Sequence, residues 1–232
     1  LRWARCVLYR YLGGLHDGLN LFQNSVEVLE KLEKNKKQYV LLTNAPRPNL
    51  TVIKYLKKMG LDEKKAQQVY TSGQAALDQL KTMNSKSFFH IGPPRDFDLF
   101  KTFEKNKLED IENSDYFLCT GLFEKQDTDL NYYRELFEKK IDKKMICTNP
   151  DLIVDKGNKR ELCAGSVAMV FEKMGGQVVY FGKPYSEVYN LSINNKNKKT
   201  LCIGDNLNTD IKGANLFNYD SLLISNGIHK KE

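Results

Sequence analysis

The chain has 232 residues, of which 41% are hydrophobic and 28% charged, and its formal net charge is +7. This composition is ordinary for a globular protein of one large or two small domains, and no apolar run approaches the ~18 residues that a membrane span needs. The lysines are scattered beside Glu and Asn, without an Arg-rich block, and Arg10 interrupts the first apolar run. We therefore expect no signal peptide, and neither a membrane nor a nucleic acid as partner.

The five cysteines are widely spaced and form no Cys-x-x-Cys pair. An odd number without close pairs argues against a disulfide framework or a zinc site. Most of them lie in apolar runs, as small buried hydrophobic residues do. We expect a reducing compartment and a cytoplasmic location.

Short apolar runs alternate with amphipathic stretches along the chain. The apolar runs predict strands at residues 7–11, 38–44, 86–92, 115–121, 144–150, 176–182, 200–205 and 220–227. Amphipathic stretches at 25–35, 49–60, 129–141 and 165–176 predict helices. This alternation predicts an α/β fold with a mostly parallel sheet covered by helices, in which ligands bind beyond the carboxyl ends of the strands.

Polar residues follow three of the predicted strands. They are Thr43 and Asn44, then Lys183 in a Gly-Lys-Pro sequence, then Asp205 and Asp210. Taken alone, the first pair can cap a turn, the second sequence can be a plain loop and an Asp can cap a helix. Together they supply a hydroxyl donor, a cation and paired carboxylates, which are the groups that a phosphate and a divalent cation need.

The sequences LLTNAPRP, GKP and GDNLNTD resemble motifs of the haloacid dehalogenase-like phosphohydrolases, specifically the NagD-like subclass IIA. FFHIGPPRD, ICTNPDLIV and LHDG extend the resemblance over nearly the whole chain. The resemblance implies a Rossmann-like core at residues 1–60 plus 177–232 and an inserted α/β cap of the C2 type at 61–176. It also implies Mg²⁺-dependent hydrolysis of phosphomonoesters through an aspartyl-phosphate.

The family motifs assign roles to the residues at the strand ends. By this resemblance, Thr43 and Asn44 bind the phosphoryl group and Lys183 neutralises its charge. Asp205 binds Mg²⁺, and Asp210 supports the metal site. In the cap, Asn149 and Asp151 match the substrate-facing loop of the family, although Asn-Pro-Asp is also a signal for the start of a helix.

The first motif of the family is degenerate in this chain. The family branch has Asp-x-Trp-Gly-x-Leu-His-Asp-Gly, and alignment on residues 15–18 places Arg10 at the nucleophilic Asp and Leu12 at the Trp. An Arg cannot attack phosphorus, and it brings a positive charge where Mg²⁺ needs a carboxylate. Asp17 and His16 follow the turn, so we expect neither of them to replace the lost carboxylate.

Two hypotheses concern the ends of the sequence. Residues 8–13 can be encoded so that a shift of one nucleotide reads Cys-Ile-Asp-Ile-Trp-Gly, which suggests that residues 1 to 13 are read out of frame. The nucleotide sequence tests this hypothesis. Family members usually continue with a further helix and strand, so we also expect a shortened C-terminus.

The sequence thus predicts a phosphatase of small phosphorylated metabolites, such as sugar or nucleotide phosphates, whose turnover is impaired by Arg10. The alternative is a non-catalytic phosphate-binding protein, in which Arg10 joins Lys183 and Thr43 as an anion clamp. A basic nucleic-acid binder is a third hypothesis. The substrate itself cannot be chosen from the sequence, and cap-mediated dimers in related proteins leave a homodimer open.

Overall fold

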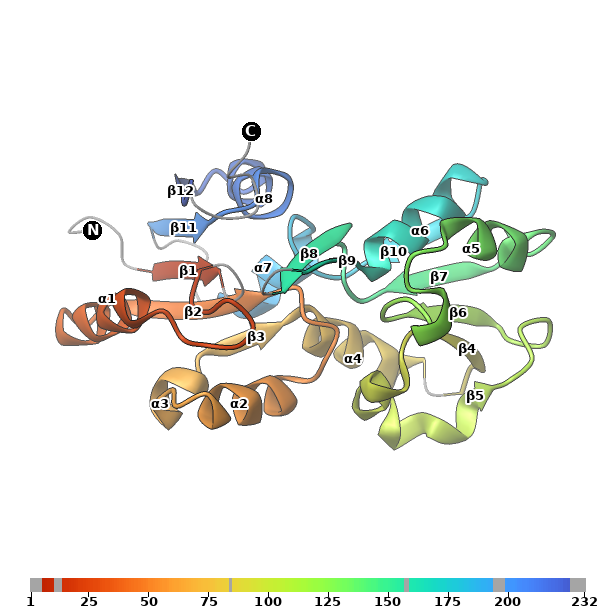
Figure 1. Cartoon of the computed structure of the whole chain (residues 1–232), viewed down its shortest axis with the longest axis horizontal. Coiled ribbons are helices and arrows are strands. Elements are labelled where there is room, and N and C mark those ends of the chain that lie inside the picture. The colour runs from red at the N-terminus through yellow and green to blue at the C-terminus, as the bar shows by residue number, and fades with distance from the viewer. Residues whose placement is uncertain (1–5, 11–13, 84, 157–158, 194–198, 226–232) are drawn as a thin grey trace.

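The computed structural model describes residues 6–10, 14–83, 85–156, 159–193 and 199–225, except for the side chains of residues 10, 155 and 156. The predictions for Leu12 and for the C-terminal end therefore lie outside the described residues. Two parallel sheets, each with five strands, form the framework, and a two-stranded hairpin lies between them (Figure 1).

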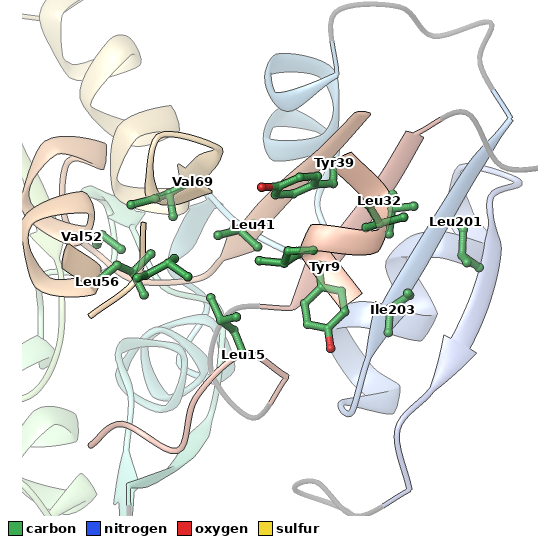
Figure 2. Packing of buried hydrophobic residues seen from close by; sticks show 14 residues of the cluster. Tyr9, Leu15, Leu32, Tyr39, Leu41, Val52, Leu56, Val69, Leu201 and Ile203 are labelled. Atoms are coloured by element: carbon green, nitrogen blue, oxygen red, sulfur yellow. The ribbon is translucent and has the colours of Figure 1, made fainter. Parts of the chain in front are cut away.

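The core sheet has the strand order β12-β11-β1-β2-β3, and all of its neighbouring strands are parallel. In that order, the strands span Asp220–Leu223, Thr200–Gly204, Cys6–Arg10, Gln38–Thr43 and Val69–Thr71. The central strand β1 is apolar on both faces because helices cover both sides of the sheet. Val7 and Tyr9 pack into one hydrophobic cluster (Figure 2), and Leu8 packs into another on the opposite face.

The cap sheet is inserted between β3 and β11 and has the strand order β10-β7-β6-β4-β5. In that order, its strands span Gln177–Tyr180, Lys144–Cys147, Tyr116–Cys119, Phe88–Ile91 and Lys107–Leu108. Phe117 and Leu118 are adjacent in β6 and pack into separate clusters on the two faces, as the period of a strand requires. The hairpin consists of β8 (Ile153–Lys156) and β9 (Lys159–Leu162), which are antiparallel.

Helices cover both sheets (Figure 1). The α-helices α1 to α8 span Gln23–Lys34, Asn49–Lys58, Glu63–Ala66, Ser72–Thr82, Leu130–Phe137, Ala164–Lys173, Ser186–Ser192 and Lys212–Leu216. The short 3-10 helices η1, η2 and η3 span Pro94–Leu99, Lys101–Asn106 and Glu124–Gln126, and η4 is a π-helical turn at Leu207–Ile211. None of the described helices is both long and apolar enough to cross a membrane.

The structure confirms the predicted α/β fold with a parallel core sheet and an inserted α/β unit. Each predicted strand and helix has a counterpart in the structure. The domain boundaries at 60/61 and 176/177 stay predictions, but the strands nearest to them pair differently from what those boundaries imply. β3 pairs with β2 in the core sheet, and β10 pairs with β7 in the cap sheet. An apolar run predicts a strand but not the sheet it joins, because the partner is set by distant parts of the chain.

Candidate active site

The carboxyl ends of three adjacent core strands bring the predicted motif positions to one edge. β1 lies between β2 and β11, and Arg10, its last residue, is in register with Leu42 of β2. Thr43 ends β2, and Asp205 directly follows β11. Because parallel strands present their carboxyl ends on the same side, the backbone positions of these motif residues share one edge of the core sheet.

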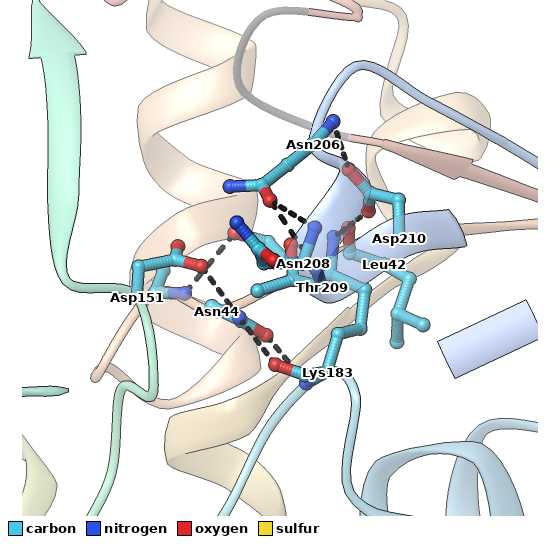
Figure 3. Close-up of polar contacts among 10 residues, drawn as sticks. Leu42, Asn44, Asp151, Lys183, Asn206, Asn208, Thr209 and Asp210 are labelled. Carbon is cyan, nitrogen blue, oxygen red and sulfur yellow. Dashed lines mark hydrogen bonds and ion pairs between the residues drawn. The ribbon is translucent and has the colours of Figure 1, made fainter. Parts of the chain in front are cut away.

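Lys183 reaches this edge from the cap sheet, because it follows β10. Its Nζ atom donates to the Leu42 carbonyl oxygen at 3.2 Å and to Asp210 Oδ1 at 2.7 Å. The side chains of Lys183 and Asp210 are only 5% and 4% exposed. A buried charge is tolerated when it is paired and hydrogen-bonded, so this pair fixes an ammonium group beside the end of β2 (Figure 3).

Asn44 ties three segments together through its carboxamide (Figure 3). Its Oδ1 accepts the backbone N–H of Lys183 at 2.8 Å, and its Nδ2 donates to the Lys183 carbonyl oxygen and to Asp151 Oδ1, both at 3.0 Å. The sequence predicted contact with phosphate for this residue. That role stays a prediction, and the Asn44 side chain also holds the Lys183 loop and the Asp151 loop, which makes Asn44 a positioning residue.

The loop after β11 is ordered by short-range hydrogen bonds. Asn206 caps η4 by accepting from the N–H groups of Asn208 and Thr209, and Asp210 Oδ2 accepts the Asn206 N–H at 3.2 Å. Asp205 is 3% exposed within this loop. Gly204 is required here because a Cβ atom would overlap the Asp210 carboxyl group.

A cavity of about 200 Å³ opens at the end of β2. It is lined by Thr43, Asn44 and Lys183, and also by Asn149 and Asp151 of the cap. The volume is several times the ~30 Å³ that one water occupies in the liquid, so the cavity has room for a phosphoryl group. Thr43 Oγ1 accepts the Ala45 N–H at 3.1 Å, which orients the hydroxyl at the cavity wall.

The Asn-Pro-Asp sequence of the cap starts no helix. Asn149 Oδ1 accepts the Asp151 N–H at 3.0 Å, and the chain continues into β8. The structure thereby excludes the helix-start explanation and leaves the substrate-loop prediction for Asn149 and Asp151 standing. Both residues line the 200 Å³ cavity together with Val154 and Cys163.

A larger cavity of about 870 Å³ adjoins the first one and shares Pro46, Asn149 and Cys163 with it. Its walls come from the carboxyl ends of β4 and β6 and from the β8–β9 hairpin. Arg47 and Asp96 also line it, and the sequence reasoning assigned no role to either. The signal for them was present in LLTNAPRP and FFHIGPPRD, but only tertiary contacts reveal that the two motifs meet.

The residues present do not complete the predicted Mg²⁺ site. Mg²⁺ binds through oxygen ligands, among them carboxylates. Asp205 and Asp210 lie in the loop after β11, but Asp210 is bonded to Lys183, and Arg10 occupies the third predicted position. Within the described part of the chain, no group of three His, Cys, Asp or Glu side chains is placed to hold a metal ion.

The other groups near the first motif have structural partners. Asp17 Oδ1 accepts the N–H groups of Leu19 and Asn20 and closes its own turn. His16 is buried and accepts the Gly18 N–H at its Nδ1, and burial lowers the pKa of His16 to about 4. Neither residue lines the 200 Å³ cavity.

Comparison with known proteins assigns the family. The profile of the haloacid dehalogenase-like hydrolases matches residues 9–104, and a profile described as HAD-hydrolase-like matches residues 180–232. No curated protein gives a significant match.

Solved structures give a similar picture over the whole chain. A haloacid dehalogenase-like hydrolase from Brucella suis shares 28% identity at a TM-score of 0.88, covering 98% of this chain and 91% of that one. A 4-nitrophenylphosphatase from Thermotoga maritima shares 24% identity at a TM-score of 0.76, covering 97% and 87%. A protein described as nagD shares 24% identity at a TM-score of 0.78, covering 100% and 92%. This chain therefore belongs to the haloacid dehalogenase-like hydrolases.

Proposed function

We propose that this chain is a phosphatase of small phosphorylated metabolites whose phosphate anchor is intact and whose catalytic nucleophile has been replaced. One observation carries the proposal. The buried Lys183–Asp210 pair lies beside the end of β2, while the neighbouring strand β1 ends in Arg10 at the same sheet edge. Similarity to phosphatases from other organisms supports the phosphomonoester as substrate class.

In this proposal, the 200 Å³ cavity holds the phosphoryl group. Lys183 Nζ supplies positive charge, and the Thr43 hydroxyl donates a hydrogen bond to a phosphoryl oxygen. The leaving group, a sugar or a nucleoside, extends into the 870 Å³ cavity beneath the β8–β9 hairpin. The hairpin and the cap sheet limit the access of water to the bound ester.

Arg10 accounts for impaired turnover, because the covalent step needs a carboxylate at the end of β1. Cys163 is a nucleophilic residue type that lines both cavities, but burial raises the pKa of its thiol, which keeps the thiol protonated and unreactive. Loss of a covalent nucleophile lowers rates by several powers of ten. Members of the family generally use Mg²⁺, and we infer that a carboxylate at position 10 is the missing part of such a site. The cytoplasmic location remains part of this proposal.

The test restores the first motif. The double variant Arg10→Asp with Leu12→Trp should hydrolyse p-nitrophenyl phosphate in the presence of Mg²⁺ at least ~10³-fold faster than the unchanged chain. Adding Lys183→Met to the double variant is the matched control and should remove the gain. A restored motif without any gain in turnover would contradict the proposal.

The alternative is a phosphate-binding protein without catalysis. The positive charge of Arg10 favours this alternative, because under it Arg10 and Lys183 both serve one anion site. Under this alternative, Arg10→Ala weakens the binding of inorganic phosphate, and the restored motif gives no turnover. Under the main proposal, Arg10→Ala leaves phosphate affinity nearly unchanged.

A further inference from the structure

The loop that carries Thr43 and Asn44 is braced by the first turn of α4. Ala45 O accepts the Gly73 N–H at 3.0 Å and the Ser72 hydroxyl at 3.1 Å. The Thr71 hydroxyl donates to Arg47 O at 2.6 Å. A Cβ atom on Gly73 would overlap the backbone of Arg47, so the two segments are in close backbone contact. We call residues 43–48 the phosphate loop.

The same loop also reaches the cap through the side chain of Arg47. Arg47 Nε lies 3.2 Å from Asp96 Oδ1, and Arg47 Nη2 donates to the Arg95 carbonyl oxygen at 3.0 Å. Asp96 lies in η1, which follows β4 in the cap, and is 3% exposed. A residue four positions beyond the phosphate-binding Thr43 is thus bonded to a buried carboxylate of the cap.

The contact between Arg47 and Asp96 is costly to displace because Asp96 is buried. Desolvation raises the pKa of Asp96, while Arg47 and the Thr120 hydroxyl favour its charged form. A buried ion pair adds little net stability, because the cost of removing water nearly offsets the attraction. Asp96 is the buried partner, whereas the Arg47 side chain is 30% exposed, so separating the two removes a cation from a buried carboxylate, which is unfavourable. The Arg47–Asp96 pair therefore helps to fix the position of the phosphate loop relative to the cap.

We propose that Asp96 is a positioning residue of the phosphate site: it holds Arg47, and through Arg47 it fixes the phosphate loop against the cap. Phosphate affinity and the position of the cap are then coupled through this ion pair, in addition to the Asn44–Asp151 contact. The inference rests on the proposed function in so far as residues 43–48 bind phosphate. The polar contact between loop and cap is itself independent of that function.

The test compares Asp96→Asn, Arg47→Gln and their combination with a matched control, Arg95→Gln. Arg95 lines the same 870 Å³ cavity, its side chain is 62% exposed, and its backbone contact to Arg47 survives the change. Hydrogen exchange at the Ala45 and Asn49 amides, which are bonded to Thr43 Oγ1 and Gln74 Oε1, reports on the loop without any ligand. Calorimetric titration with inorganic phosphate reports on affinity.

Both single variants should speed exchange at these two amides and weaken phosphate affinity about tenfold, with no change in strands β6 and β7. The double variant should bind phosphate no more weakly than either single variant, because both substitutions remove the same Arg47–Asp96 ion pair. Arg95→Gln should change both readouts less than Arg47→Gln does, because Arg95 acts on Asp96 through its charge, whereas Arg47 also donates a hydrogen bond to it.

Unchanged loop exchange in Asp96→Asn and Arg47→Gln overturns the inference. So does faster exchange throughout the cap, which indicates a general structural role, or an equal effect in Arg95→Gln, which indicates loss of charge alone. If no variant and not even the unchanged chain binds phosphate, the proposed function fails. The exchange measurement then decides the inference by itself.

Discussion

The ends of β2 and β1 are neighbours in one sheet, yet their residues differ in what they can do. At the end of β2, Leu42 and Asn44 meet Lys183 and Asp210 in a connected set of hydrogen bonds. At the end of β1, the chain places Arg10 where the family motif requires a carboxylate.

The groups proposed to bind phosphate thus lie at the end of β2, and the position proposed for the nucleophile lies at the end of β1. The anchor at β2 is held by the fold, because Lys183 comes from the cap sheet and Asp210 from the loop after β11. At the predicted nucleophile position, the backbone keeps the strand register, because Arg10 pairs with Leu42. In the proposed function, the chain therefore loses turnover without losing its phosphate site.

The largest effect should come from breaking the anchor. Lys183→Met removes the cation that neutralises the buried Asp210 carboxylate, which should lower the free energy of unfolding by about 3–5 kcal/mol. Lys57→Met is the matched control, because Lys57 Nζ lies 3.0 Å from Glu63 but both side chains are well exposed. This control should cost less than about 1 kcal/mol. Urea denaturation measures both, and equal effects would contradict a special role of the buried pair.

The second largest effect comes from two buried histidines, His16 in the segment after β1 and His90 in β4. The effect at His16 tests whether the region after β1 is folded although its motif is degenerate. Burial lowers the pKa of both His16 and His90 to about 4. The unfolded chain binds more protons than the folded chain between pH 4 and 6.5, so stability rises with pH across this window. The loss on acidification should be at most about 3 kcal/mol for each histidine.

The matching variants keep the hydrogen-bonding atom of each ring. His16→Asn replaces the Nδ1 acceptor, and His90→Gln replaces the Nε2 atom that contacts the Thr120 hydroxyl at 2.8 Å. Each variant should flatten the dependence of the unfolding free energy on pH. If His16→Asn leaves the slope unchanged, the turn after β1 is not packed as described.

The smallest effect concerns the space around Asn44. Gly182 has a φ of +121°, and a Cβ atom there would lie 2.7 Å from Asn44 Oδ1. Gly175 also has a positive φ, but its nearest neighbour would be 3.8 Å away. Gly182→Ala should therefore destabilise the chain by about 2 kcal/mol more than Gly175→Ala, because only the first adds a steric clash to the backbone strain. Thermal denaturation of both variants measures the difference.

The sequence predicted local structure better than it predicted partners. Periodicity located the long strands and helices, because burial on one or two faces leaves a direct pattern. It missed β3, whose three residues are too few to show a period, and it could not assign β10 to a sheet. The motifs placed Thr43 and Lys183 near each other, but the contacts of Asn44 and the Arg47–Asp96 pair are tertiary and leave no local signal.

The central claim is that the anchor built around Lys183 binds phosphate without a nucleophile at the end of β1. Calorimetric titration of the unchanged chain with inorganic phosphate in metal-free buffer tests this claim most directly. We predict saturable binding to one site and its loss in Lys183→Met. Absence of binding, or binding that Lys183→Met leaves undiminished, would contradict the account.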